Sequence, residues 1–131
     1  VSGTNKYLTC QNTSGGVYLN GGSATSWSAV SDETRKVIIE PITDGLNKVN
    51  TLRTVIGRLK TDDETVRRPY LIAQDVQAVL PEAVTVGKDT EGNEQIGLSY
   101  SDVMPLLVAA IKEQQALITT LTARIEALEN K

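Results

Sequence analysis

A heptad pattern at the C-terminal end of the chain constrains its fold more than any other feature. Over four heptads, apolar residues and one glutamine recur at alternating steps of three and four, which places them on one narrow stripe of a helix. This stripe consists of Met104, Leu107, Ile111, Gln114, Ile118, Leu121, Ile125 and Leu128. With Ser101-Asp102 as a predicted cap, the pattern predicts a coiled-coil helix over residues 101–131 with the stripe as its seam.

The pattern leaves the number of strands in the coiled coil open. Alternating Ile and Leu seam positions favour two strands, but a polar seam residue such as Gln114 can override that preference. The competing interpretation is an amphipathic helix packed on its own domain, whose apolar stripe is wider. Polar or small residues at the outer positions favour the coiled coil, namely Lys112, Glu113, Thr119, Thr120, Thr122, Ala123, Glu126 and Ala127.

Residues 1–30 differ in composition from the rest of the chain. They are rich in Ser, Thr, Gly and Asn, and the runs 6–10 and 17–19 are short strand candidates beside glycine pairs. Because the segment has few large apolar residues, we do not expect it to fold alone. We interpret it as the end of a longer β-rich shaft.

Residues 31–100 predict a small mixed α/β domain. A helix is expected after a cap at Thr43 or Asp44, with an apolar face that continues to Leu59. The other expected elements are a strand at 37–39, a strand at 70–72, a helix at 74–80 ended by Pro81, and a hairpin of 83–86 and 95–100 around the turn 90–93. The predicted fold class is therefore α+β, with a β-rich start and a long C-terminal helix.

Composition excludes several kinds of chemistry. The net charge of −3 argues against non-specific nucleic-acid binding, which needs basic patches, and no apolar run has the length of a membrane span. Cys10 is alone, so an internal disulfide and a Cys-rich zinc site are excluded, and we predict neither metal nor cofactor. Histidine is absent, which removes Ser-His-Asp and Cys-His catalysis within one chain.

Several blocks of residues occur together in a recognisable order. Ser31-Asp32 is followed by Lys36, and the later blocks are Tyr70–Val76 with Leu80-Pro81-Glu82, Leu98–Asp102, and Ala110–Gln115 running into the heptads. In this order the chain resembles the chaperone-of-endosialidase domain, the C-terminal intramolecular chaperone of phage tail spikes, tail fibres and neck appendages. The resemblance covers residues 31–131, which makes 1–30 the shaft end and 31–131 the chaperone domain.

The resemblance implies a function. Domains of this family trimerise a fibre protein, guide the folding of the preceding stalk, and then release themselves by cutting the peptide bond before a serine. The family's catalytic serine and lysine correspond to Ser31 and Lys36, so the cut is expected between Val30 and Ser31. The family's usual motif is Ser-Asp-x-Arg-Leu-Lys, from which Thr34 and Arg35 depart.

The implied partners are two further copies of the chain and the upstream shaft as folding client, with no nucleic acid or membrane. The implied location is the host cytoplasm during virion assembly, after which the shaft joins the phage tail and the chaperone is released. The alternatives are a trimerisation cap that stays attached and, least favoured, an enzyme such as a glycosidase, for which no domain of adequate size is present.

The residues around the bond between Val30 and Ser31 allow a specific cleavage chemistry. A serine hydroxyl needs a base to take its proton, and without histidine a neutral lysine is the candidate. Burial disfavours the charged form of a lysine, and a lysine is more easily buried at an interface between subunits than on one small domain. Asp32 is a candidate supporting residue. Read alone, Ser31-Asp32-Glu33 is also a common helix start.

Overall fold

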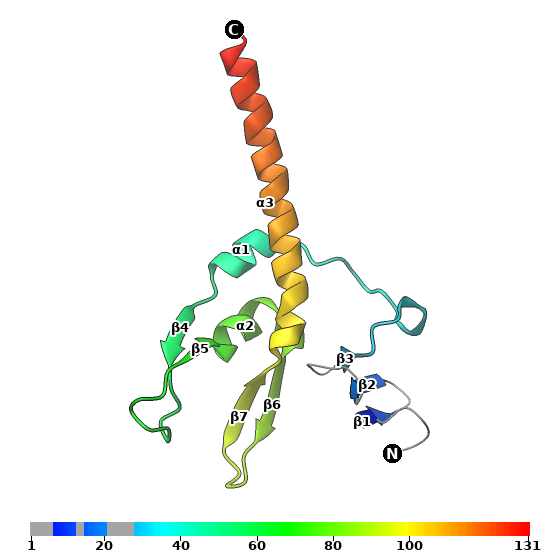
Figure 1. Cartoon of the computed structure of the whole chain (residues 1–131), viewed down its shortest axis with the longest axis vertical. Coiled ribbons are helices and arrows are strands. Elements are labelled where there is room, and N and C mark those ends of the chain that lie inside the picture. The colour runs from blue at the N-terminus through cyan, green and yellow to red at the C-terminus, as the bar shows by residue number, and fades with distance from the viewer. Residues whose placement is uncertain (1–6, 13–14, 21–27) are drawn as a thin grey trace. The chain divides into compact units, whose positions relative to one another are not determined.

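The computed structural model describes residues 7–12, 15–20 and 28–131, and the chain divides by its contacts into two units, Val1–Pro41 and Ile42–Lys131. The predicted α+β class is confirmed. Short hairpins and short helices precede a long C-terminal helix, α3 (Tyr100–Glu129), which is the dominant element of Figure 1.

The first unit contains a three-stranded antiparallel sheet in the order β1-β2-β3. Strand β1 (Tyr7–Asn12) pairs with β2 (Gly15–Asn20) from Tyr7 opposite Asn20 to Asn12 opposite Gly15. Strand β3 (Ser28–Ala29) pairs with β2 and is followed by a single 3-10 turn, η1 (Glu33–Arg35). Both predicted strands are confirmed, although Lys6 lies outside the described residues.

The predicted strand at 37–39 is wrong for the single chain. Val37, Ile38 and Ile39 pair with no described strand and are 90%, 73% and 91% exposed. A β-branched run has high strand propensity, but that preference is expressed only where the run packs on a sheet. Within the described chain this segment has no sheet to join.

The second unit begins with a helix that is shorter than predicted. Helix α1 (Gly45–Asn50) ends before Leu52, and the expected continuation to Leu59 is instead strand β4 (Thr54–Gly57). Burial alternates along β4, with Val55 and Gly57 more buried than their neighbours, which is the period of a strand rather than a helix. Strand β4 pairs with β5 (Arg68–Leu71), and this pairing overrides the helical spacing.

Most of the remaining predictions for this unit are confirmed, but two are wrong. Tyr100, predicted to end a strand, is the first residue of α3, and Ser101-Asp102, predicted as the cap, lie inside that helix, whose N-cap is Ser99. Helix α2 (Ala73–Val79) ends before Pro81, which opens the turn η2 (Pro81–Ala83). Strands β6 (Val84–Lys88) and β7 (Glu94–Leu98) form the predicted hairpin. In its turn, Asp89 Oδ1 accepts the backbone N–H groups of Glu91 and Asn93, each at 2.9 Å.

A small core joins these elements to the base of α3. Val76, Ala83 and Val103 are buried together, and Leu52, Leu71, Leu80, Val84 and Leu98 pack around them. Figure 1 shows the β6–β7 hairpin and α2 at the lower end of α3, with α1 beside the helix further up. No described helix has the length and apolar character needed to cross a membrane.

Helix α3 has two different stripes. Val103, Leu106 and Ala110, spaced three and four apart, are buried against the helix's own unit. The predicted seam lies on other positions and is exposed, and every residue from 114 to 131 is exposed. The helix therefore packs on its own domain over its first turns, as the competing interpretation expected, and leaves the rest uncovered.

Candidate functional site

The structure brings Ser31 and Lys36 together. The Lys36 ammonium Nζ donates a hydrogen bond to Ser31 Oγ at 2.7 Å, although the two residues are five positions apart. The turn η1 lies between them, and the Lys36 backbone N–H donates to the Glu33 carbonyl at 3.0 Å. One tight turn thus reverses the chain enough for the two side chains to meet.

Asp32 holds this turn in place. Its Oδ1 accepts the backbone N–H of Thr34 at 2.9 Å and the Thr34 hydroxyl at 2.8 Å, which is the usual geometry of an N-cap aspartate. The hydrogen bond from the Thr34 hydroxyl, then that from its backbone N–H, and finally the charge of Lys36 lower the pKa of Asp32. Thr34, which departs from the family's motif, therefore contributes a contact to the turn between Ser31 and Lys36.

The peptide bond between Val30 and Ser31 lies at a change in environment. It follows β3, in which Ser28 and Ala29 are opposite Tyr18 and Val17 of β2. Val30 is half-buried, whereas every residue from 31 to 40 is exposed. The carbonyl that Ser31 would attack thus directly follows a sheet-bound strand, and the serine itself is accessible.

The residues of the predicted seam lie on the exposed part of α3. The seven apolar residues are between 42% and 66% exposed, and Gln114 is exposed as well. Contacts within the described chain do not account for such a row of large apolar side chains, which soluble proteins usually cover.

Glu113 has a role that sequence reasoning missed. We expected it to be an outer polar position, but its carboxylate caps the start of α1: Gly45 N–H donates to Oε1 at 2.9 Å and Leu46 N–H to Oε2 at 2.8 Å. The N–H groups of Leu46 and then Gly45 lower the pKa of Glu113. Asp44, the predicted cap, has a left-handed φ of 57° and makes no capping bond with its side chain. No local signal links positions so far apart in sequence.

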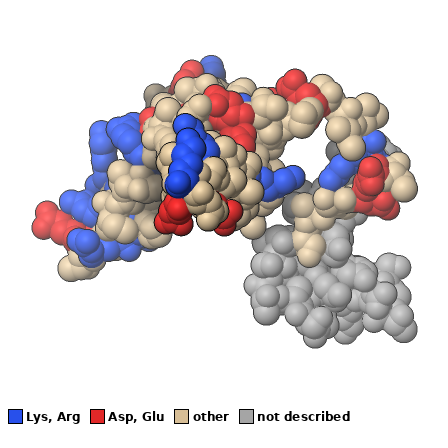
Figure 2. Space-filling model, turned by 90° about the horizontal axis from the view of Figure 1, so that it is seen from above, with Lys and Arg blue, Asp and Glu red and all other residues tan. Residues whose placement is uncertain are grey.

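Two ion pairs tie the second unit together. Arg53 binds Asp75 through two nitrogens, at 2.7 and 2.9 Å, and Arg68 binds Asp62 at 2.6 Å. On the face shown in Figure 2, acidic and basic side chains are interspersed over the described surface. In the described part of the chain, no group of three or more His, Cys, Asp or Glu residues is placed to hold a metal ion.

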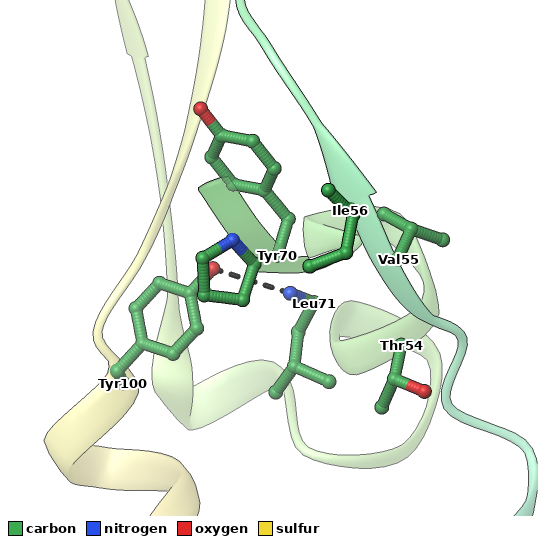
Figure 3. Close-up of a pocket in the computed structure, with 7 residues that line it drawn as sticks. Thr54, Val55, Ile56, Tyr70, Leu71 and Tyr100 are labelled. Carbon is green, nitrogen blue, oxygen red and sulfur yellow. Dashed lines mark hydrogen bonds between the residues drawn. The ribbon is translucent and has the colours of Figure 1, made fainter. Parts of the chain in front are cut away.

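An apolar cavity of about 410 Å³ opens beside the β4–β5 hairpin. Figure 3 shows Val55, Ile56 and Tyr70 around it, with the ring of Tyr100 entering from the start of α3. The Tyr100 hydroxyl accepts the backbone N–H of Leu71 at 3.2 Å, which fixes the ring at the wall. The sequence predicted Tyr100 as the end of the strand 95–100, whereas it is the first residue of α3. It lies four positions before Met104 and so continues the seam's alternation.

Comparison with known proteins identifies a matching family and similar proteins. Residues 31–85 match the profile of a peptidase family described as chaperone of endosialidase. The chain is also 35% identical, over 104 residues and 77% of its length, to the long tail fiber protein Gp37 of Enterobacteria phage K3, and equally to that of Enterobacteria phage T2. It spans less than a tenth of these relatives, 8% and 7% of their lengths respectively.

Proposed function

Because the chain belongs to the chaperone-of-endosialidase family, we propose that residues 31–131 form a homotrimeric intramolecular chaperone of a phage tail fibre or tail spike. We further propose that the domain releases itself by cutting between Val30 and Ser31, with Ser31 as nucleophile and Lys36 as base. The observation that carries the proposal is the 2.7 Å contact between Lys36 Nζ and Ser31 Oγ.

The atoms and protons of the proposed reaction balance with this pair and one water. Lys36 Nζ takes the proton of Ser31 Oγ, and this oxygen then bonds to the carbonyl carbon of Val30. The bond between that carbon and the Ser31 nitrogen breaks. The proton passes from Lys36 to the released amine, and an ester joins Val30 to the Ser31 side chain. Water then hydrolyses the ester, which leaves a carboxylate on Val30 and restores the hydroxyl of Ser31.

The direction of the hydrogen bond matters for this step. Lys36 is the donor in the single chain and is exposed there, whereas a base must accept the serine proton. An ammonium loses its charge more readily when it is removed from water. We therefore expect the Ser31–Lys36 pair to become reactive when trimer assembly covers it, so that cleavage follows assembly.

The client of the chaperone is the shaft that ends in residues 1–30. Three glycine-rich strands must meet in register, and ordering them is entropically costly. A trimer at the C-terminal end raises the local concentration of the three chain ends. On this proposal the shaft folds in the host cytoplasm and joins the phage tail, whereas the cut domain is released.

Intact mass of the purified protein tests the cleavage. We expect the wild-type chain to give two fragments, the larger beginning at Ser31, and expect Ser31→Ala and Lys36→Ala each to remain uncut. Lys60→Ala, at another exposed lysine, is the matched control and should cleave normally. A different N-terminal residue on the larger fragment, or full cleavage of Lys36→Ala, would contradict the proposed mechanism.

A cap that trimerises without cleaving is the second candidate. The exposure of Lys36 in the single chain favours it, as does the departure at Thr34 and Arg35 from the family's motif. The two candidates differ in one measurement, because the cap predicts a single uncut mass for a protein that sedimentation equilibrium finds to be trimeric.

A further inference from the structure

The segment Val37–Ile39 is apolar and exposed, as expected of a segment that docks on another protein surface. It follows Lys36, whose backbone is extended at φ −117° and ψ 150°, and it presents three consecutive large aliphatic side chains to solvent. Exposing three such residues in a row is costly, and they are not on the seam of α3. Contacts within the described chain do not offset this free-energy cost.

The cavity beside Tyr100 has matching chemistry. Val55, Ile56 and Leu71 contribute aliphatic walls, and Ile56 is 59% exposed at the rim. The sheet under it has only two strands, so β4 and β5 each pair along one edge and leave the other unpaired among the described elements. An apolar extended segment is the kind of ligand that fits a short hydrophobic surface beside a free strand edge.

The position of Tyr100 indicates which molecule supplies that segment. Tyr100, Met104 and Leu107 are spaced by four and three, so the ring lies in register with the seam through which copies of the chain are proposed to associate. The cavity therefore continues the surface that faces a neighbouring copy. A partner held along the seam would bring its own residues to the cavity.

We infer that Val37–Ile39 of one copy docks in the Tyr100 cavity of a neighbouring copy, and that this docking activates the adjacent Lys36. The inference rests on the proposed function, since it names the contact through which the trimer controls cleavage. Docked residues next to Lys36 would remove water from the Ser31–Lys36 pair, which favours the neutral amine. In a ring of three copies the exchange closes on itself, each copy giving one segment and receiving another.

Disulfide trapping tests the contact directly. In a chain carrying Cys10→Ser and Ser31→Ala, Ile56→Cys is combined in turn with Val37→Cys, Ile38→Cys or Ile39→Cys. Successive side chains of an extended segment point to opposite sides, so at least one of the three faces the cavity. We expect mild oxidation to give a covalent trimer for at least one pair, and none when Val86→Cys replaces Ile56→Cys.

The result that overturns the inference is specific. Disulfides confined to single chains, or free thiols in all three pairs, would exclude docking between copies. Trapping is done on uncut protein, so it does not depend on cleavage. If the wild-type chain fails to cleave or to trimerise, the proposed function fails instead.

Cleavage kinetics test the link to Lys36. Ile56→Ser removes an exposed aliphatic wall of the cavity while leaving the seam intact, and should slow cleavage about tenfold or more at unchanged trimer content. Val86→Ser, at a similarly exposed valine on the β6–β7 hairpin, should cleave at the wild-type rate. Equal rates for the two variants would overturn the link between docking and activation.

Discussion

Substituting Gly45 by alanine tests how α1 is joined to α3. Gly45 is buried, and a Cβ at this position would lie 2.8 Å from Ala110 N and 3.1 Å from Ala109 C, both backbone atoms of α3. Among the described glycines only Gly92 has a positive φ, so Gly45 is required by this close approach and not by its backbone conformation. Since a helix backbone cannot yield locally, the two helices must separate.

The expected change in the free energy of unfolding of Gly45→Ala is the balance of two opposed effects. Overpacking of this kind costs about 1–3 kcal/mol, whereas replacing glycine by alanine in a helix gains about 0.5–1 kcal/mol, and less at the first helical position. We expect a net loss of about 1–2 kcal/mol, which lowers the Tm of a domain of this size by about 5–15 °C.

The assay is thermal unfolding followed by the helical circular dichroism signal, in a Ser31→Ala background at one protein concentration, because an assembly's Tm depends on concentration. Gly87→Ala is the matched control, since no atom lies within 4 Å of a Cβ at that position. A Tm for Gly45→Ala equal to that of Gly87→Ala would refute the close-approach argument.

Three further predictions follow from the structure. Replacing Ile118 and Leu121 by serine should give monomers in sedimentation equilibrium and uncut chains in intact mass, whereas polar changes at outer positions of the same turns should alter neither. Thr34→Val should slow cleavage about two- to tenfold by removing the hydroxyl donor to the capping aspartate, while Thr34→Ser should keep the wild-type rate. The lowered pKa of Glu113 means that its contribution to stability is present above the ordinary value of 4.5 and is lost as pH falls through the folded-state value. The Tm difference between wild type and Glu113→Gln should therefore be largest near neutral pH and vanish in acid, and Glu126→Gln, at an exposed glutamate of the same helix, is the matched control.

Local signals in the sequence determined much of this fold. The heptads predicted the long helix, Pro81 marked the end of α2, and Gly92 in the turn marked the β6–β7 hairpin. Each of these signals acts through neighbours within one or two turns, so it can be read without knowing the rest of the structure. The candidate site is different, because Ser31-Asp32-Glu33 read alone is also a common helix start, and the pair of Ser31 and Lys36 was expected only from the family resemblance. Their contact itself is local, since a single capped turn separates them.

Tertiary structure decided what local patterns left ambiguous. Residues 52–59 have helical spacing, but pairing with β5 makes Thr54–Gly57 a strand. Residues 37–39 have strand propensity but no strand within the described chain to pair with. The cap of α1 comes from Glu113, 68 positions away from Gly45. These outcomes depend on which distant surface meets a segment, because pairing and burial supply more free energy than intrinsic propensity.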